Sequence, residues 1–345
     1  MQSNSTIRQF NNSTTRTAII TGIGGQDGAY LAKYLISLGY RVTGITRSLT
    51  TFQDFRLKYL GILDQVRLIE CREMDRASLV GILEEVRPEE VYNLAAQSSV
   101  GLSFEQPYAT VQFNILSVLS WLEAILETNK AVKFYQASSS EMFGNIDRNK
   151  LPLRENLMFH PASPYGISKA AAHWLVVNYR EARKMFAANG ILFNHESALR
   201  GMNYVVKKII NHLVKIKLQW TDQPLTVGNT AIRRDWGYAP YYVAAMHRIL
   251  QHHSADDFLV CSGNVMSLDD LIDKACNRLG LDKERYVKTD PALYRPNELF
   301  EIYGDPSKAR LELGWKYELS NDELIAKLIE DEIDFIHWES AHRKA

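Results

Sequence analysis

The residues best suited to acid–base chemistry are a tyrosine and a lysine four positions apart in the segment S-P-Y-G-I-S-K. Ser163 and Pro164 are typical of a helix start, because serine caps the first turn and proline fits its first position. Tyr165 and Lys169 then lie on one helical face. A nearby ammonium group lowers the pKa of a phenol, and the phenolate can accept a proton from a substrate hydroxyl. The pair therefore indicates a general base, with an ordinary surface pair as the alternative.

A second reactive group follows the predicted strand at 133–138, in the segment A-S-S-S-E-M-F-G. In a parallel sheet, side chains at the carboxyl end of a strand face the ligand cleft. Ser139, Ser140 and Glu141 are therefore expected at that cleft, where hydroxyls and a carboxylate can hold a substrate and move its protons. Taken singly, serines also cap turns and carboxylates also lie in solvent, so the interpretation depends on the motifs occurring together.

Glycines between the first predicted strand, 17–21, and the first predicted helix have the spacing of a dinucleotide-binding turn. The segment is T-G-I-G-G-Q-D-G, and the helix begins within it. Such a turn lets backbone amides approach a pyrophosphate, and the helix N-terminus adds partial positive charge. A glycine-rich turn without a ligand is the alternative. The residues that we expect to contact the cofactor are Gly22, Gly25, Gln26, Asp27 and Gly28.

The end of the second predicted strand, 41–47, indicates which dinucleotide is bound. Sites for NAD usually carry Asp or Glu here to hold the ribose 2′-hydroxyl, whereas arginine accommodates a 2′-phosphate. No carboxylate occurs between Val42 and Gln53, and Arg47 ends the strand. NADP is therefore the predicted cofactor, unless Arg47 is only a solvated strand-end residue. A further strand, predicted to pass beneath the cofactor, ends in Leu94, Ala95 and Ala96.

These motifs lie on a regular alternation of short strands and longer helices. Strands are predicted at 17–21, 41–47, 90–96, 133–138 and 191–197, and helices at 26–38, 76–85, 110–128, 170–183, 200–220, 269–280 and 321–340. The alternation predicts an α/β fold, a Rossmann-type doubly wound parallel sheet with a smaller C-terminal α/β substrate-binding region. The predicted parts are a disordered leader at 1–15, an NADP-binding domain at 16–190 completed by the strand at 191–197, and a substrate-binding region at 198–345.

Composition narrows the possible partners and the compartment. Lys plus Arg and Asp plus Glu both number 40, so no net charge attracts nucleic acid or an anionic membrane, and we expect neither partner. Three widely spaced cysteines, Cys71, Cys261 and Cys276, form no C-x-x-C pair. This argues against a disulfide framework and against a metal site. A reducing cytoplasm suits such cysteines best.

The order of the motifs resembles the extended short-chain dehydrogenase/reductase superfamily. Within it, longer segments are similar to the GDP-mannose 4,6-dehydratases, from about Thr17 to near Trp315. The most distinctive segments are G-Q-D-G in the glycine turn and N-H-E-S at 194–197. The resemblance implies an NADP-dependent dehydratase that converts GDP-mannose, or a relative such as GDP-manno-heptose, to the 4-keto-6-deoxy sugar. It implies oxidation at C4, loss of water across C5 and C6, and return of the hydride to C6.

The resemblance also implies roles for individual residues. Tyr165 takes the proton of the 4-hydroxyl beside Lys169, and Ser139 supports the 4-oxygen. Glu141 removes the C5 proton. The group that protonates the departing 6-hydroxyl stays open, because Ser140 stands where some related dehydratases have Asp. A homodimer or homotetramer is expected, with the apolar helix near 170–183 in the seam. The residues expected to contact the GDP-sugar are Ser98, Ser140, Asn194, Lys208, Arg234, Arg295 and Glu298.

The segment after N-H-E-S departs from the family pattern. The family reads P-R-R-G-E-x-F-V-T-R-K-I, and this chain reads A-L-R-G-M-N-Y-V-V-K-K-I. Leu199 replaces a basic residue, Met202 an acidic one and Lys207 an arginine, so the sugar and the base stay open. A superfamily epimerase, reductase or decarboxylase is the alternative enzyme, although Glu141 favours dehydration over epimerisation. A non-catalytic dinucleotide sensor is a further alternative, which the presence of both tyrosine and lysine disfavours.

Overall fold

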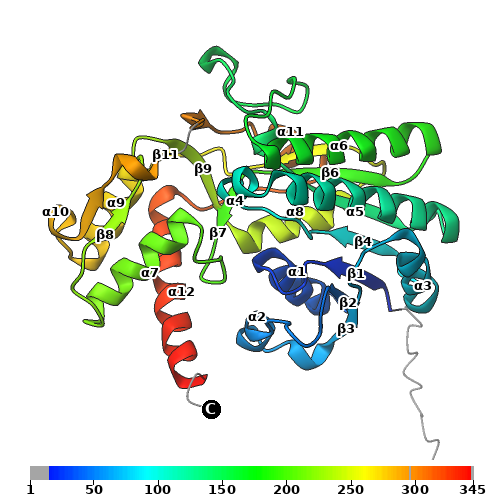
Figure 1. The fold of residues 1–345 in the computed structure, drawn as a ribbon, viewed down its shortest axis with the longest axis horizontal. Coiled ribbons are helices and arrows are strands. Elements are labelled where there is room, and N and C mark those ends of the chain that lie inside the picture. The colour runs from blue at the N-terminus through cyan, green and yellow to red at the C-terminus, as the bar shows by residue number, and fades with distance from the viewer. Residues whose placement is uncertain (1–14, 295–296, 343–345) are drawn as a thin grey trace, which may run out of the picture.

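The computed structural model describes residues 15–294 and 297–342. Its largest element is a parallel sheet of seven strands in the order β10-β6-β5-β4-β1-β2-β3 (Figure 1). The order reverses beside β1, where ligands bind in doubly wound sheets. The predicted Rossmann-type fold is therefore confirmed. The strands are β1 (Thr17–Thr21), β2 (Arg41–Thr46), β3 (Val66–Glu70), β4 (Glu90–Asn93), β5 (Lys133–Ser139), β6 (Ala187–Leu192) and β10 (Asp257–Val260).

Helices cover both faces of this sheet. They are α1 (Gln26–Ser37), α2 (Phe55–Tyr59), α3 (Arg76–Val86), α4 (Val100–Glu105), α5 (Pro107–Thr128), α6 (Pro164–Arg183), α8 (Ala239–Gln251) and α11 (Ser307–Glu312). Short 3-10 turns occur at Leu63–Gln65, Ser140–Met142, Arg148–Lys150 and Pro291–Leu293. By length and composition α5 could cross a membrane, but core helices pass the same test, and α5 packs between α3 and α6.

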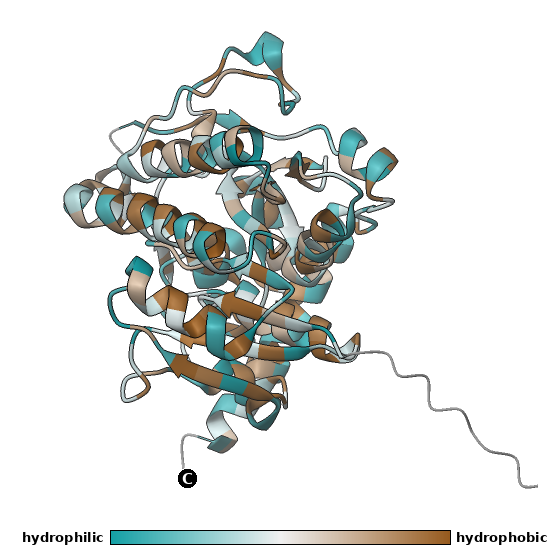
Figure 2. Ribbon diagram, turned by 90° about the vertical axis from the view of Figure 1, so that its right-hand side faces the viewer, coloured by the Kyte–Doolittle hydropathy of each residue, from teal (hydrophilic) through white to brown (hydrophobic). Residues whose placement is uncertain are grey.

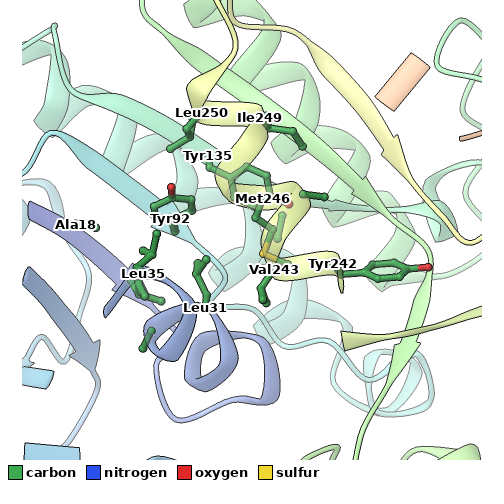
Figure 3. Packing of buried hydrophobic residues seen from close by; sticks show 14 of the residues in the cluster. Ala18, Leu31, Leu35, Tyr92, Tyr135, Tyr242, Val243, Met246, Ile249 and Leu250 are labelled. Atoms are coloured by element: carbon green, nitrogen blue, oxygen red, sulfur yellow. The ribbon is translucent and has the colours of Figure 1, made fainter. Parts of the chain in front are cut away.

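Side chains of the central strands alternate between two apolar layers, as the two-residue period of a strand requires. Ala18 and Ile20 pack with residues of α1 and α8, such as Leu31 and Met246 (Figure 3). Ile19, between them in sequence, packs with α3, α5 and α6 on the opposite face. Because both faces are buried, slipping a strand by one residue would exchange its two layers, so burial fixes the register of the sheet.

A second, smaller region has its own apolar core. Residues of α7, α9 and α12 make up most of this core, and β9 pairs with β7, β11 and β13. In Figure 2, which is viewed from the side of the large sheet, brown apolar residues alternate with teal hydrophilic ones along the helices in front. The elements are β7 (Asn194–Glu196), α7 (Val205–Lys217), β8 (Leu225–Val227), β9 (Arg233–Tyr238), β11 (Val265–Ser267), α9 (Leu268–Leu279), α10 (Lys283–Tyr286), β12 (Val287–Thr289), β13 (Glu301–Ile302) and α12 (Asn321–His342).

Several boundaries differ from the predicted ones. The expected strand at 191–197 is two strands: β6 begins at Ala187, and β7 leaves the large sheet to pair with β9. The expected helix at 200–220 is shorter, because a loop precedes α7. α8 and β10 come after residue 198 in the sequence, yet α8 packs on the large sheet and β10 pairs with β6 at its edge. Most of the predicted leader lies outside the described residues, and the predicted division into parts stays a prediction.

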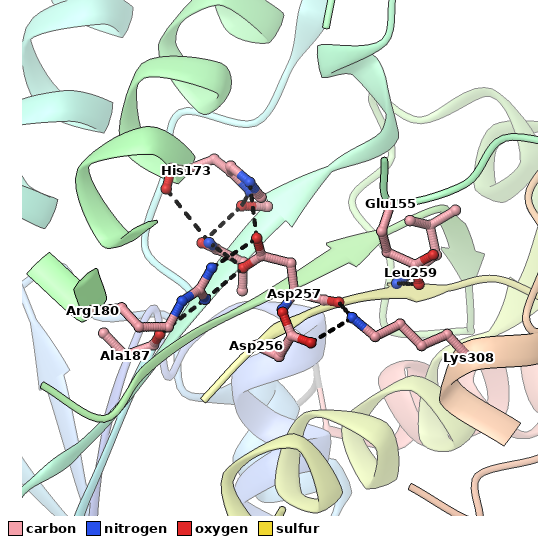
Figure 4. A network of polar contacts seen from close by, with 10 residues as sticks. Glu155, His173, Arg180, Ala187, Asp256, Asp257, Leu259 and Lys308 are labelled. Carbon is pink, nitrogen blue, oxygen red and sulfur yellow. Dashed lines mark hydrogen bonds and ion pairs between the residues drawn. The ribbon is translucent and has the colours of Figure 1, made fainter. Parts of the chain in front are cut away.

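A polar network fastens β10 to α6 and β6 (Figure 4). Asp257 accepts hydrogen bonds from both Nη atoms of Arg180, at 2.8 and 3.0 Å, and from Asn189 Nδ2 at 2.8 Å. Its Oδ2 lies 3.4 Å from His173 Nε2. Burial opposes ionisation of Asp257, but His173 and Arg180 outweigh it and hold the pKa of this carboxyl well below its usual range. The network therefore holds the helix that carries Tyr165 against the sheet.

Candidate active site

The glycine turn between β1 and α1 has no room for side chains. Gly22 has a φ of +69°, and a Cβ atom there would lie 3.1 Å from the backbone nitrogen of Ala95. A Cβ atom at Gly28 would lie 2.3 Å from the carbonyl oxygen of Gly22, and one at Gly25 3.1 Å from the same oxygen. The backbone thus forms the surface of the turn at the N-terminus of α1. This cradle fits the pyrophosphate of a dinucleotide.

A chain of buried side chains joins the carboxyl ends of β1 and β4 to the middle of β5. Thr21 Oγ1 donates to Asn93 Oδ1 at 2.7 Å, and Asn93 Nδ2 donates to Gln136 Oε1 at 2.8 Å. Thr21 Oγ1 also accepts from the backbone nitrogens of Leu94 and Ala95, at 3.0 and 2.9 Å. These bonds hold the segment after β4, which includes the half-buried Ala96, beside the glycine turn. The structure thus brings together the segments predicted to contact the cofactor.

Gln26 and Asp27 of the G-Q-D-G segment contact the N-H-E-S segment. Gln26 Nε2 donates to the carbonyl oxygen of His195 at 3.2 Å, and Ser197 Oγ donates to Gln26 Oε1 at 2.7 Å. Asp27 Oδ2 lies 3.0 Å from His195 Nε2. Burial opposes ionisation of Asp27, but His195 and Arg200 outweigh it and keep the pKa well below its usual range. Because both side chains are engaged within the protein, their predicted cofactor contacts depend on backbone amides.

Arg47 lies one residue beyond β2 and is exposed. Its guanidinium carbon is 5.8 Å from the ring centre of Phe113 on α5. Among residues 15–294 and 297–342, no carboxylate forms an ion pair with Arg47. This position, beside the strand next to the glycine turn, suits contact with a 2′-phosphate, which stays a prediction.

Tyr165 and Lys169 lie on the first two turns of α6, as predicted. Ser163 caps the helix by accepting from the backbone nitrogen of Gly166 at 3.0 Å, and Pro164 occupies its first turn. Tyr165 and Lys169 are both buried, and Lys169 Nζ is 5.8 Å from the ring centre of Tyr165. The Lys169 ammonium donates to the carbonyl oxygen of Ala137 on β5 at 2.9 Å. The helix thus holds both groups against the end of β5.

The protein alone does not lower the pKa of the phenol. Burial raises the pKa of Tyr165, a hydrogen bond with Ser139 opposes this, and the Glu141 carboxylate adds to it. Burial lowers the pKa of Lys169 to about 8, against the attraction of Asp27. The cation that lowers the pKa of Tyr165 is Arg200, and burial outweighs its effect, so the expected lowering is not seen.

The end of β5 places the serines and the glutamate beside Tyr165. Ser139 is the last residue of the strand, and its Oγ accepts from the backbone nitrogen of Glu141 at 3.2 Å. Ser140 is buried, and Glu141 is half-buried in the 3-10 turn. A Cβ atom at Gly166 would lie 2.7 Å from the carbonyl oxygen of Glu141, so α6 packs directly on this turn. A hydroxyl, a phenol and a carboxylate therefore converge at one point.

The residues predicted to hold the nucleotide lie in the smaller region. Arg234 on β9 is buried and donates to the carbonyl oxygens of Arg233 and Phe300 at 2.9 and 3.3 Å. Its Nη2 lies 3.8 Å from Glu298 Oε1, so two of the predicted residues are neighbours. Lys208 on α7 donates to the carbonyl oxygen of Thr226 at 3.2 Å.

Of the two other residues predicted to contact the nucleotide, the structure describes only one. Asn194 begins β7 and is half-buried. Arg295 lies outside the described residues.

Among the described parts of the chain, no group of three or more His, Cys, Asp or Glu side chains is arranged to hold a metal ion.

Sequence reasoning missed two arginines beside the glycine turn. Arg200 Nε lies 3.7 Å from Glu196 Oε2, and its guanidinium carbon lies 3.8 Å from the ring centre of Tyr204. Burial disfavours the charge of Arg200, but Glu196, Tyr204 and Asp27 together outweigh burial and raise the pKa of Arg200. Arg56 donates to the carbonyl oxygens of Gly24 and Leu199, each at 2.8 Å. Arg200 could have been assigned to the site from the sequence, because it lies just after N-H-E-S. Nothing in the sequence around Arg56 indicates that it reaches the site.

The departures from the family pattern have local explanations at two positions. Leu199 is fully buried and packs with Phe335 of α12, where a charged side chain would lose its hydration. Lys207 forms an ion pair with Glu332 of α12, and both side chains are buried. Met202 is 51% exposed, and nothing in the structure explains its choice. The first two changes adapt the loop after β7 to the C-terminal helix.

Comparison with known proteins matches this geometry to one family. The family model for "GDP-mannose 4,6 dehydratase" matches residues 19–328. GDP-mannose 4,6 dehydratase 2 of Arabidopsis thaliana is 40% identical over 329 residues, covering 92% of this chain and 87% of its own length. The human GDP-mannose 4,6 dehydratase is 38% identical over 344 residues, with 92% of each chain covered. The fold is also similar to dTDP-glucose 4,6-dehydratase from Bacillus anthracis, with a TM-score of 0.81, 15% identity and coverage of 94% and 98%.

Proposed function

The chain belongs to the GDP-mannose 4,6-dehydratase family, and from this premise we propose that it dehydrates GDP-mannose, or a close relative such as GDP-manno-heptose, to the 4-keto-6-deoxy sugar. The observation that carries the proposal is the convergence of Ser139, Glu141 and Tyr165 at the end of β5. Oxidation at C4 needs a hydroxyl-binding group and a base. Loss of water additionally needs a base for the C5 proton, and a carboxylate at this point supplies it.

A nicotinamide dinucleotide is the cofactor, and we propose NADP. The glycine turn would hold it, and it would supply the hydride chemistry that oxidation at C4 and reduction at C6 require. The residues proposed to hold it are Gly22, Gly25, Gln26, Asp27, Gly28, Arg47, Leu94, Ala95, Ala96, Tyr165 and Lys169. What favours NADP is the exposed Arg47, with no carboxylate close in sequence to select a 2′-hydroxyl.

Tyr165, Ser139 and Glu141 divide the proton transfers between them. Tyr165 removes the proton from the 4-hydroxyl, while Ser139 donates a hydrogen bond to the 4-oxygen. Because burial raises the pKa of Tyr165, its phenolate form depends on nearby positive charge, which the Lys169 ammonium supplies. Glu141 then takes the C5 proton, which the neighbouring ketone has made acidic, and the C6 hydroxyl leaves as water. Glu141 or a bound water is the proton donor to that leaving group.

The nucleotide half of the substrate is proposed to lie against the smaller region. Arg234 and Glu298 are adjacent, and a guanidinium group suits a diphosphate because its donors are planar and paired. Three cysteines are free and buried, which fits the proposed cytoplasmic location. The remaining residues proposed to contact the substrate are Ser98, Ser140, Asn194, Lys208 and Arg295.

We further propose that the chain forms a homodimer through α5 and α6, or a homotetramer made of two such dimers. Leu116 on α5 and Ile167 and Trp174 on α6 are each at least half exposed, at 50%, 50% and 59%. Burying such a patch against its own copy is the usual use of apolar surface on packed helices. Light scattering should give at least twice the chain mass for the wild type, and Trp174→Glu should shift it toward the monomer.

A panel of nucleotide sugars tests the function. The enzyme with NADP⁺ should convert GDP-mannose or GDP-manno-heptose to a product lighter by one water, measured by mass spectrometry. The matching UDP- and dTDP-sugars should stay unchanged. The absence of dehydration with every GDP-sugar, or a C4 epimer as the product, would contradict the proposal.

A further inference from the structure

A hydroxyl pair joins the two sides of the site. Tyr204 precedes α7 and is half-buried, and Ser98, which is exposed, follows β4. The Tyr204 hydroxyl and Ser98 Oγ are 2.7 Å apart, although 106 positions separate the residues in sequence. One partner belongs to the segment beside the glycine turn, and the other to the loop that carries Arg200. The pair therefore links the cofactor side of the site to the substrate side.

Arg200 fixes the Tyr204 ring beside the reacting centre. The Arg200 guanidinium carbon lies 3.8 Å from the centre of the Tyr204 ring, a stacking distance for a cation on an aromatic face. Tyr204 is also close enough to Tyr165 to help raise the pKa of the Tyr165 phenol, to which burial contributes most. We therefore expect a sugar whose C4 hydroxyl reaches Tyr165 to pass close to Tyr204.

We propose that Tyr204 and Ser98 form a hydroxyl clasp that binds the sugar ring, with Tyr204 as a specificity-determining residue. This inference rests on the proposed function. In the free protein the two hydroxyls bond to each other; with substrate bound, they bond to hydroxyl groups of the hexose. Sites that hydrogen-bond a substrate hydroxyl discriminate strongly against sugars that lack it.

The clasp is tested by comparing GDP-mannose with GDP. Both affinities are measured by calorimetry with NADP⁺ present, in a Tyr165→Phe background that prevents turnover. Tyr204→Phe removes one oxygen and keeps the ring under Arg200. Tyr204→Phe and Ser98→Ala should each weaken the binding of GDP-mannose roughly two- to tenfold, the range for one net hydrogen bond. The affinity for GDP should stay within roughly twofold of the wild type. The double variant should bind GDP-mannose more weakly than either single variant, because each hydroxyl makes its own bond to the sugar in the bound state.

Tyr286→Phe is the matched control, because Tyr286 also stacks with an arginine, at 4.9 Å from Arg285, but on α10. It should change neither affinity. Equal weakening of GDP-mannose and GDP by Tyr204→Phe, or no weakening of either, would overturn the clasp. Failure of the protein with Tyr165 and Tyr204 intact to dehydrate any GDP-sugar would instead overturn the proposed function. The two failures are therefore distinguishable.

Discussion

Replacing Asp257 by asparagine should destabilise the protein far more than the same change at its neighbour Asp256. The asparagine side chain would keep the shape of the aspartate but present an amide to the Arg180 guanidinium, which in the wild type meets a carboxylate at 2.8 and 3.0 Å. Removing one partner of a buried ion pair costs about 3–5 kcal/mol. The side chains of Arg180 and Asp257 are 15% and 18% exposed, so we expect the lower end, about 3 kcal/mol.

Asp256→Asn is the control because Asp256 pairs with Lys308 at 2.6 Å while remaining 44% exposed. Asp256→Asn should lower the free energy of unfolding by less than about 1 kcal/mol, as for other surface ion pairs. Urea unfolding at pH 7 and at lower pH, followed by tryptophan fluorescence, measures both. Because the folded-state pKa of Asp257 lies below its unfolded value of about 3.9, its contribution is complete above about pH 4 and is lost as pH falls further. Equal losses for both variants at pH 7, or a loss at Asp257 that does not shrink in acid, would refute this reasoning.

Three further outcomes follow from the site. Arg47→Ala should weaken NADP⁺ binding at least tenfold and leave NAD⁺ almost unchanged, since a charge-assisted contact contributes about 1.5–3 kcal/mol; titration by fluorescence measures both. Tyr165→Phe should lower turnover at least ~100-fold while calorimetry shows normal GDP-mannose binding, and a rate above a tenth of wild type would exclude its role as base. Lys169→Met should be inactive yet unfold at higher urea than wild type at pH 7. Because burial lowers the pKa of Lys169 to about 8, that advantage should shrink as pH rises from 8 to 10.5.

The sequence was sufficient to predict five of the seven strands of the main sheet, but not β3 or β10, together with the elements around the reactive residues. The helix carrying Tyr165 begins at Pro164 under a Ser163 cap, as local propensity requires. Gly22 and Gly28 have the tight turn expected from their spacing. These features depend on residues close in sequence. The chemistry assigned to the site residues stays a prediction until it is measured.

Contacts between distant segments could not be predicted in the same way. β7 leaves the large sheet because it pairs with β9, which lies some forty residues later in the sequence. The residues of β7 alone do not indicate this pairing. Burial, not spacing, sets the pKa of Tyr165, and burial depends on the whole fold. Gln26 and Asp27 contact His195 of β7, whereas their place in the glycine turn indicated only a ligand. Arg56 reaches the site through two backbone carbonyls that belong to separate segments.

Dehydration of GDP-mannose in D₂O tests the central claim most directly, with product analysis by NMR. The account predicts a 4-keto-6-deoxy product that carries solvent deuterium at C5, while a hydrogen from substrate C4 appears at C6. Glu141→Gln should form enzyme-bound NADPH on mixing with substrate but release no water, because only the base for C5 is lost. A wild-type product without deuterium at C5, or one whose C6 hydrogen comes from solvent, would contradict the assignment of Glu141 and Tyr165 to successive steps of one dehydration.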